Sequence, residues 1–263
     1  MIYVLLPAYN EEKSLDFLLP KLNEFFKNEN LEYKIIACND GSKDNTLEKL
    51  QNYQRKFPIE IINHKINRGL GETIRDLFER AAEIAKDDDI IIRMDCDDTH
   101  EPQYIKGLIN KINEGCDVVI ASRFVEGGGQ EGLDIYRKII SKLANLFMKF
   151  FFPIKGLKEY SSGFRAYRAK VIKYAIEVYG NNFIQLKGLG FTGTLEKIVK
   201  LKMLGAKFCE SPFVLRYDQK RSESKMISSI TTFGYFVLVI LYHWPWGGWK
   251  NGYKNIKKLH EKE

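Results

Sequence analysis

The chain has 263 residues, of which 44% are hydrophobic and 29% are charged, and its formal net charge is +7. This length and composition suit one large α/β domain or two small ones and exclude a chain too polar to form a hydrophobic core. The excess of lysine and arginine favours anionic partners such as nucleotides, phosphates or an anionic membrane surface.

The first half of the chain alternates short apolar runs with amphipathic stretches of helical length. Near-continuous Ile and Val runs separated by helices predict a largely parallel sheet that is covered on both faces. Pro20 lies inside the first helical pattern and is expected to kink or shorten that helix. The strands are expected at residues 2–6, 33–38, 59–63, 90–94 and 117–121, and the helices at residues 11–27, 44–56, 72–86 and 103–113.

Polar clusters follow four of the predicted strands. They read "PAYNEE" after the first strand, "NDGSKDNT" after the second, "DCDD" after the fourth and "SRFVEGGG" after the fifth. Because parallel α/β sheets bind ligands beyond the carboxyl ends of their strands, the clusters predict a site at that edge of the sheet. Within the second cluster, a turn and a helix cap explain Ser42, Asp44 and Thr46 better than a ligand does.

The fourth predicted strand ends in a group of three carboxylates: Asp95, Asp97 and Asp98. They repel one another unless a cation or a strong donor intervenes, and a solvated acidic turn is the alternative interpretation. Asp95 and Asp97 are two positions apart on an extended segment, so both can face one side and hold Mg²⁺ or Mn²⁺ beside a diphosphate. Asp40, at the neighbouring strand end, suits a ribose hydroxyl or a base N–H. By alternation Arg93 points away from this face, and we assign it no role.

The cysteines and histidines give no sign of a metal site. The four cysteines form no CxxC pair, so free thiols in a cytosolic chain are expected. The four histidines are scattered, and each is expected to be structural or on the surface. These residues are Cys38, Cys96, Cys116 and Cys209, and His64, His100, His243 and His260.

The second half of the chain contains a basic, aromatic-rich helical pattern over residues 135–152. It places Lys138, Lys142 and Lys149 among apolar residues, which suits a helix at an anionic membrane surface. An ordinary core helix with solvated lysines is the alternative. A further helix is expected near residues 192–204, followed by a strand-like "FVLRY".

Residues 226–249 contain no Asp, Glu, Lys or Arg. The densely apolar part covers only residues 233–241, which falls short of the roughly 20 apolar residues of a spanning helix. The aromatic and basic flanks favour an interfacial or re-entrant helix. A true membrane span and a buried helix or oligomer contact are the alternatives.

Several of these stretches resemble a known family. "VLLPAYNEE", "NDGSKDNT", "NRGLGETI" and "MDCDD" resemble the nucleotide-sugar half of the family 2 inverting glycosyltransferases. "ASRFVEGGG", "YRKIISKLANLFMKFFF", "SSGFRAYRAKVI" and "SESKM" resemble the polyprenyl-phosphate hexosyltransferases, the dolichol-phosphate mannose synthases among them. The resemblance implies a Rossmann-like GT-A domain over residues 1–225, mostly parallel with helices on both faces. Residues 226–263 would then be a C-terminal amphipathic, interfacial segment with a basic tail.

The resemblance also implies roles for individual residues. One group would bind the nucleotide-sugar donor, two aspartates would hold the divalent cation, and a further group would bind the acceptor phosphate. Asp97, Arg123 and Lys225 would be catalytic. The donor group is Pro7, Tyr9, Glu11, Asp40 and Asp95; the metal pair is Asp95 and Asp97; the acceptor group is Arg123, Arg165, Arg168, Ser224 and Lys225.

The chain departs from the family pattern at three places. Asn39 stands where the family often has Asp, and Ser222 stands where "GESK" has its glycine, which alters the flexibility expected of that loop. Asp98 and Thr99 replace a commoner Leu followed by Gln or Ser. The last departure puts Thr99 in doubt as a third metal ligand.

Two missing motifs favour a lipid-phosphate acceptor. The stretch that usually carries the catalytic base reads "GFTGTLEKIVK", with Glu196 but no Asp, and no QxxRW run occurs. A phosphate oxygen is already anionic, so it needs positioning and charge neutralisation rather than deprotonation.

The sequence therefore predicts a metal-dependent transferase that moves mannose or glucose from GDP-mannose or UDP-glucose to a polyprenyl phosphate. It would act in the cytoplasm, peripherally on the inner face of the membrane, without a nucleic-acid partner. One alternative is a family 2 enzyme that acts on a saccharide hydroxyl. The other is a non-catalytic, membrane-associated nucleotide-binding protein.

Overall fold

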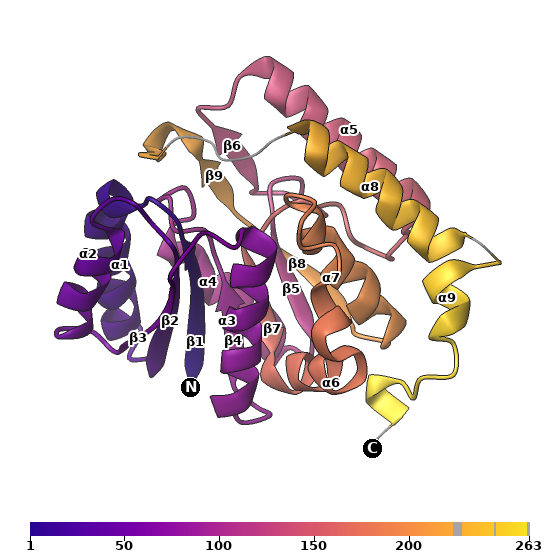
Figure 1. Cartoon of the computed structure of the whole chain (residues 1–263), viewed down its shortest axis with the longest axis horizontal. Helices are drawn as coiled ribbons and strands as arrows, with labels where there is room; N and C mark the ends of the chain where they lie inside the picture. Colours follow the sequence, from indigo (N-terminus) through magenta and orange to yellow (C-terminus); the bar gives the residue numbers. More distant parts are fainter. Residues whose placement is uncertain (223–227, 245, 262–263) are drawn as a thin grey trace.

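Short runs of Ile, Leu and Val form the central sheet of the computed structural model, which describes residues 1–222, 228–244 and 246–261 (Figure 1). The sheet has seven strands in the order β3-β2-β1-β4-β7-β5-β8. All neighbouring strands are parallel except that β7 is antiparallel to β4 and β5. The strands are β1 (Ile2–Ala8), β2 (Tyr33–Asp40), β3 (Ile59–His64), β4 (Ile90–Arg93), β5 (Val118–Ser122), β7 (Arg165–Arg168) and β8 (Phe208–Pro212).

Helices cover both faces of this sheet, so the predicted mostly parallel α/β fold is confirmed. Alternate residues of β1 belong to different cores: Val4 packs with helices α1, α2 and α4, and Leu5 packs with α3, α6 and α7. This division follows from the two-residue period of a strand. The helices are α1 (Glu12–Asn28), α2 (Thr46–Gln54), α3 (Leu70–Ile84), α4 (Ile105–Asn113), α6 (Ala169–Tyr179) and α7 (Thr192–Met203).

Helix α1 continues through Pro20, so the expected shortening is wrong. Proline removes one backbone hydrogen bond from a helix interior. Here Leu18, Leu19 and Leu22 are fully buried around it. Tertiary packing of this apolar face supplies most of the helix's stability and outweighs the lost bond.

Strand β7 was not predicted, although it lies in the middle of the sheet. Its sequence "RAYR" begins and ends with arginine and has no apolar run. It is nevertheless buried between two strands, with Ala166 and Tyr167 facing opposite cores. Helix α6 and strand β8 were also not predicted.

Helices α5 (Ile135–Phe151) and α8 (Ser228–His243) lie side by side outside the main helical layer (Figure 1). Phe147 of α5 contacts Phe236 of α8, with ring centroids 5.3 Å apart. Only Asn145 and Met148 of α5 are buried, so α5 is not an ordinary core helix. In the described part of the chain, every helix is too short or too polar to cross a membrane.

Small elements join this pair of helices to the sheet. Strands β6 (Gly129–Glu131) and β9 (Val214–Arg216) form a separate two-stranded parallel sheet. After α8, the short helix α9 (Gly248–Gly252) leads the chain back to the core, where Leu259 is buried.

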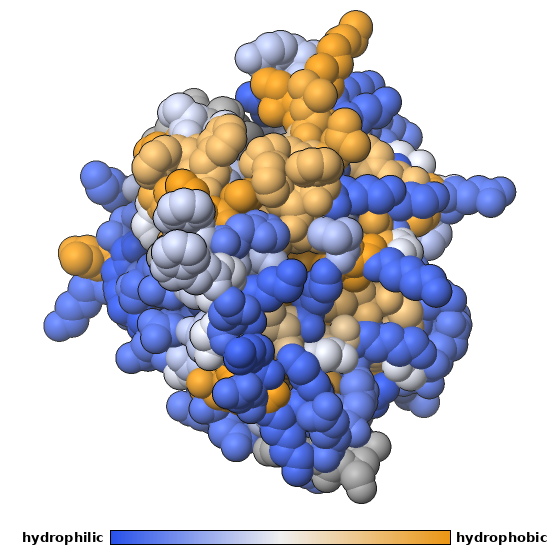
Figure 2. All heavy atoms as spheres, turned by 90° about the vertical axis from the view of Figure 1, so that its right-hand side faces the viewer, coloured by the Kyte–Doolittle hydropathy of each residue, from blue (hydrophilic) through white to orange (hydrophobic). Residues whose placement is uncertain are grey.

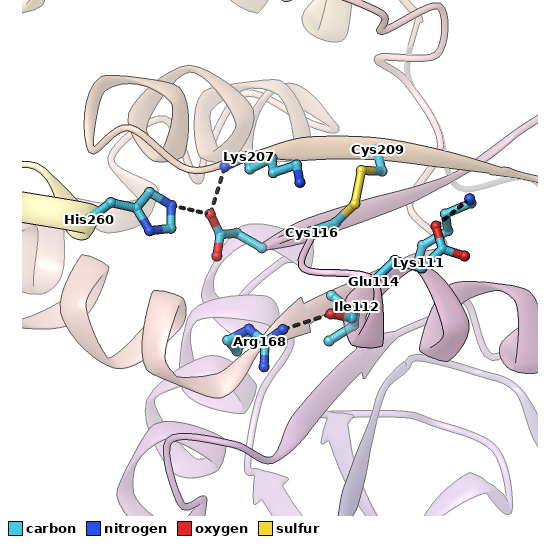
Figure 3. The surroundings of a disulfide bond; sticks show 9 residues. Lys111, Ile112, Glu114, Cys116, Arg168, Lys207, Cys209 and His260 are labelled. Carbon is cyan, nitrogen blue, oxygen red and sulfur yellow. Dashed lines mark hydrogen bonds and ion pairs between the residues drawn. A yellow bond between two sulfur atoms is a disulfide. The ribbon is translucent and has the colours of Figure 1, made fainter. Parts of the chain in front are cut away.

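Two of the four cysteines form a disulfide bond, which corrects the expectation of four free thiols (Figure 3). Cys116 immediately precedes β5 and Cys209 lies in β8, and these strands are parallel neighbours. Their Cα atoms are 6.0 Å apart although 93 residues separate them in sequence. Cys38 and Cys96 are buried and lie outside this disulfide. Because two of the cysteines are oxidised to a disulfide, the cysteines no longer support the expected cytosolic location.

Candidate active site

The carboxyl ends of β1, β2 and β4 surround a cavity of about 570 Å³, which we call the donor cavity. Its wall contains every residue that the sequence assigned to the donor and the metal. Lys187 and Gly188 from the segment before α7 form part of the opposite wall. The predicted residues in the wall are Pro7, Tyr9, Glu11, Asp40, Asp95 and Asp97.

The loops after β1 and β2 hold each other in place through side chains that the sequence assigned to turns and caps. The backbone N–H of Glu11 donates to Thr46 Oγ1 at 2.7 Å, and that of Asn10 donates to Ser42 Oγ at 3.0 Å. Asp44 accepts from the N–H of Glu12 at 3.2 Å. These bonds satisfy N–H groups at the start of α1. At the following helix, α2, for which the sequence predicted the cap, Asp44 Oδ1 accepts from the N–H of the first residue, Thr46, at 3.0 Å.

Asp40 is tied to the loop that precedes α3. Its Oδ1 accepts from the backbone N–H of Arg68 at 2.8 Å and lies 2.7 Å from His64 Nδ1, and its Oδ2 accepts from the N–H of Gly69 at 2.9 Å. Gly69 has a φ of +89°, a conformation that favours glycine. Asp40 therefore shapes the donor cavity as well as facing it.

The three carboxylates after β4 have different partners. Asp95 Oδ1 lies 2.6 Å from Arg93 Nη2, and Asp97 is paired with Lys220 and accepts from Thr99 Oγ1 at 2.6 Å. Asp98 turns away to α1, where Lys21 Nζ lies 2.9 Å from it. The crowding is thus relieved by three separate cations, and only Asp95 and Asp97 face the cavity.

The surroundings of Asp97 favour its ionised form. Burial alone would raise the pKa of Asp97, but the charge of Lys220, the neighbouring His100 and hydrogen bonds from Lys220 and Thr99 lower it overall. Burial lowers the pKa of His100, whose Nδ1 accepts from the backbone N–H of Asp95 at 3.0 Å. The carboxylate that faces the cavity at Asp97 is therefore ionised.

Two carboxylates in a polar cavity fit a hard divalent cation, because Mg²⁺ and Mn²⁺ prefer oxygen ligands. Lys220 already places a cationic group on Asp97, which shows that positive charge is accommodated there. No third His, Cys, Asp or Glu joins the pair within the described ranges. The remaining oxygen ligands would have to come from a bound diphosphate or from water.

A second, larger cavity of about 1220 Å³ lies between α5 and α8, and we call it the apolar groove. Leu143, Leu146, Phe150 and Phe236 are among the apolar residues of its wall. Its inner end is polar and adjoins the donor cavity. The residues common to both walls are Asp95, Asp97, Phe191 and Lys220.

Arg123, which the sequence assigned to the acceptor phosphate, lies in the wall of the groove and is paired internally. Its Nε and Nη2 lie 2.7 and 3.0 Å from the two carboxylate oxygens of Glu159, and Nη2 donates to Ser161 Oγ at 2.8 Å. Burial raises the pKa of Glu159, but Arg123 and Ser161 lower it overall. The pair fixes the guanidinium plane of Arg123 at the groove wall.

Sequence reasoning missed two basic residues of the groove. Lys220 joins the two cavities, and Arg137 lies in the first turn of α5 beside Tyr217. Lys220 lies five positions before the predicted Lys225, in the same basic stretch. Arg137 belongs to the quoted "YRKIIS", where a cation at the start of an amphipathic helix was the available signal.

The other predicted acceptor residues are not at the groove. Arg165 is buried and donates to the carbonyl oxygens of Tyr160, Ser162 and Thr194, so it holds the backbone together. Arg168 is paired in register with Ile90, at the opposite end of β4 from the carboxylates. These two assignments are therefore corrected. Ser224 and Lys225 lie outside the described residues.

The comparisons with known proteins agree with this geometry. Residues 3–175 match the family model described as glycosyl transferase family 2. A dolichol-phosphate mannosyltransferase of Pyrococcus furiosus is 32% identical over 226 residues, which cover 86% of this chain. The match spans only 59% of the length of that relative. An undecaprenyl-phosphate mannosyltransferase of Micrococcus luteus is 27% identical over 230 residues, or 87% of this chain and 88% of the relative.

A solved structure shares the fold. Glucosyl-3-phosphoglycerate synthase from Mycobacterium tuberculosis, in complex with Mn²⁺, UDP and phosphoglyceric acid, superposes with a TM-score of 0.62. The superposition covers 91% of this chain and 77% of that chain at 15% sequence identity. At this identity the likeness concerns the fold alone.

Proposed function

The chain belongs to glycosyl transferase family 2, and we propose that it transfers a hexose from a nucleotide sugar to a polyprenyl phosphate. The observation that carries the proposal is the junction of the two cavities. A polar cavity with two aspartates meets, at Lys220, an apolar groove whose wall contains residues of helices α5 and α8. A nucleotide sugar suits the polar cavity with its two aspartates, and a phosphate that carries a hydrocarbon chain suits the apolar groove.

The donor would occupy the donor cavity. Pro7, Tyr9 and Glu11 would contact the base and ribose, with Asp40 beside them, and GDP-mannose or UDP-glucose would supply the sugar. Asp95 and Asp97 would hold Mg²⁺ or Mn²⁺, which when bound stabilises the negative charge of the departing diphosphate. The relatives that carry mannosyltransferase names favour mannose as the sugar.

The acceptor phosphate would lie at the polar end of the apolar groove. Arg123, Arg137 and Lys220 supply positive charge there from three different segments of the chain. A phosphate oxygen would attack the anomeric carbon of the sugar, and the bond from that carbon to the diphosphate would break with inversion. The three cations position the nucleophile and reduce the repulsion between two anionic substrates.

The surroundings of Glu196 support an acceptor that needs no general base. This carboxylate is fully buried, pairs with Lys200 at 2.5 Å and accepts from the backbone N–H groups of Gln185 and Leu186 at 2.8 Å each. It belongs to neither cavity wall. Glu196 therefore stabilises the start of α7 and is out of reach of an acceptor hydroxyl, which a saccharide-directed enzyme would have to deprotonate.

The outer face of α5 and α8 supports a peripheral position on a membrane. Figure 2 shows apolar side chains gathered on the upper part of the face that lies to the right in Figure 1. Interfacial helices bury such side chains at the boundary between headgroups and acyl chains. We place this face on the inner leaflet of the cytoplasmic membrane. The exposed large apolar residues are Ile135, Tyr136, Ile139, Ile140, Leu143, Leu146 and Phe150 on α5, Ile230, Phe233, Phe236 and Ile240 on α8, and Trp244 and Trp246 beyond it.

A donor panel tests the proposal. The purified chain is incubated with Mn²⁺ or Mg²⁺, labelled GDP-mannose or UDP-glucose, and undecaprenyl phosphate in liposomes. We expect label to enter the lipid extract with one of these donors and not when the phosphate-free polyprenol replaces the acceptor. Label that stays in water, or that transfers to an added oligosaccharide, contradicts the proposal.

A matched pair of aspartate variants tests catalysis at the same site. We expect Asp97→Asn to reduce transfer by about 10²–10³-fold, because it removes one carboxylate of the metal pair. Asp98→Asn is the control: Asp98 is one residue away, points to Lys21 and has a φ of +64°, which asparagine also adopts. We expect this variant to retain most of the activity. Full activity in Asp97→Asn would instead indicate a non-catalytic nucleotide-binding protein.

A further inference from the structure

Arg93 is a buried cation directly behind the donor cavity. It ends β4, and its side chain is only 3% exposed. The ion pair described for it joins Nη2 to Asp95 Oδ1 at 2.6 Å. Its Nε and Nη2 are both buried without a hydrogen-bond partner within the described residues, so the contact with Asp95 is an ion pair that lacks hydrogen-bond geometry. Because a buried charge is costly unless it is paired, the guanidinium depends strongly on the carboxylate of Asp95.

The space for this guanidinium exists because residue 163 is glycine. A Cβ atom at Gly163 would lie 1.5 Å from Arg93 Nη1, far inside van der Waals contact. Gly163 is also part of the wall of the apolar groove. The backbone of this segment therefore packs directly against the guanidinium of Arg93.

The other charged groups near Arg93 are mostly positive. Arg165 is its antiparallel partner in β7, and Lys197 lies close enough for its charge to interact. Burial first, and then the charges of Arg165 and Arg93, hold the pKa of Lys197 well below its usual value. Glu159 and Glu196 are engaged with Arg123 and Lys200, respectively. Asp95 is therefore the anion that balances Arg93.

Asp97 is balanced in the same way by Lys220. The two carboxylates and the two cations together carry no net charge. A site of this kind attracts a free divalent cation weakly, whereas a nucleoside diphosphate brings the negative charge that the site lacks. The two balancing cations differ, because Arg93 is buried and fixed in the sheet while Lys220 lies in a surface segment after η3 (Tyr217–Gln219).

We propose that Arg93 is a positioning residue that fixes and charge-balances Asp95, so that the cavity takes up a divalent cation together with a nucleoside diphosphate and not alone. The inference rests on the proposed function only in taking Asp95 as a metal ligand. It requires neither a particular sugar nor a lipid acceptor.

Binding of Mn²⁺, followed by the loss of the EPR signal of the free ion, tests this inference without any turnover. In the wild-type chain we expect weak binding of Mn²⁺ alone and binding at least about tenfold tighter in the presence of UDP or GDP. In Arg93→Met we expect Mn²⁺ alone to bind about tenfold more tightly than in the wild type, because Asp95 is no longer balanced. Transfer activity should nevertheless fall, because Asp95 is no longer held in place.

Three controls separate this effect from damage to the fold. Arg93→Lys keeps the charge and should restore the weak binding of Mn²⁺ alone. Arg168→Met makes the same chemical change at the other end of the paired strands β4 and β7, away from Asp95. This variant should bind Mn²⁺ like the wild type. Arg93→Gln, which keeps a donor toward Asp95, replaces Arg93→Met if the latter does not fold.

Two results would overturn the inference. One is unchanged or weaker binding of Mn²⁺ alone in a folded neutral variant of Arg93. The other is wild-type binding of Mn²⁺ alone that is as tight as its binding with UDP or GDP, a comparison that needs no variant. Neither measurement contains an acceptor, so a failure of the proposed lipid acceptor leaves this inference standing, and the reverse also holds.

Discussion

At the scale of single residues, charged side chains of the site form ion pairs: Asp95 with Arg93, Asp97 with Lys220 and Glu159 with Arg123. The pair of Arg123 and Glu159 is the most buried of those at the groove, with side chains 8% and 0% exposed. Breaking such a pair leaves one buried charge without a partner, which costs more than the intact pair contributes. We therefore expect the loss of Glu159 to affect both stability and the position of Arg123 in the groove wall.

We expect Glu159→Gln to lower the free energy of unfolding by about 3 kcal/mol, because Arg123 stays buried and charged. Chemical denaturation at neutral pH measures this. Glu83→Gln is the control: Glu83 forms a surface pair with Arg80 at 2.9 Å and should change stability by less than about 1 kcal/mol. Equal effects of the two substitutions would contradict the buried pair.

The same carboxylate predicts a dependence of stability on pH. The folded-state pKa of Glu159 is lowered from its ordinary 4.5, so its contribution is fully present above that value. The contribution is lost as the pH falls through the ordinary value toward the lowered one. The stability difference between the wild type and Glu159→Gln should therefore shrink on acidification in that window, and a constant difference would contradict the shift.

The residues assigned to the donor could be placed at the sheet edge from the sequence, whereas of the described residues assigned to the acceptor only Arg123 lies in the wall of the groove. Pro7 and Asp40 lie in the last two residues of apolar strands and Asp97 follows shortly after one, so the end of each strand fixes their place at the sheet edge. Arg165 and Arg168 lie in a short strand that no apolar run marks, and their burial depends on neighbours far away in sequence. Lys220 reaches Asp97 across 123 residues, a contact that only the folded chain creates.

At the scale of secondary-structure elements, α5 combines two roles that the sequence left as alternatives. Its inner side packs on the core through Met148, while Leu146 and Phe150 are 64% and 77% exposed. The periodicity of the sequence shows that a helix is amphipathic, but not whether its apolar side faces a core, a groove or a membrane. The structure places Met148 of α5 in the core, whereas Leu146 and Phe150 lie both in the wall of the groove and at the surface.

We expect the double substitution Leu146→Ser and Phe150→Ser to weaken binding to anionic lipid vesicles at least about tenfold, because two large apolar side chains no longer enter the interface. Co-sedimentation with vesicles that contain no polyprenyl lipid measures membrane binding apart from acceptor binding. Ile66→Ser is the control, since Ile66 is 71% exposed but lies in the loop after β3. Unchanged co-sedimentation of the double variant would show that α5 does not contact the membrane.

At the scale of the whole molecule, β1 to β5 and α1 to α4 could be predicted because each of these strands has an apolar run and each of these helices an amphipathic pattern. Contacts between distant segments could not be predicted in this way. Strand β7 enters the sheet between β4 and β5 from a segment that follows both of them. The disulfide between Cys116 and Cys209 exists because β8 is placed beside β5, which no local spacing indicates.

We expect Cys116→Ser to lower the free energy of unfolding by about 2–4 kcal/mol, because the bond closes a loop of 93 residues in the unfolded chain. The disulfide lies before the amino-terminal end of β5, so binding of nucleoside diphosphate at the opposite edge should be unchanged. Denaturation with and without reductant provides the control, since reduction should destabilise the wild type and not the variant. A wild type that is insensitive to reductant would contradict the bond.

The arrangement of two cavities that meet at Lys220 has a consequence for turnover. Reactants of opposite solubility could react while each remains in its own phase: the nucleotide would exchange with water, and the glycolipid would diffuse away sideways within the leaflet. The rate would then follow the mole fraction of acceptor in the bilayer rather than its bulk concentration. Adding inert lipid to the vesicles would slow the reaction, whereas adding more vesicles of the same composition would not.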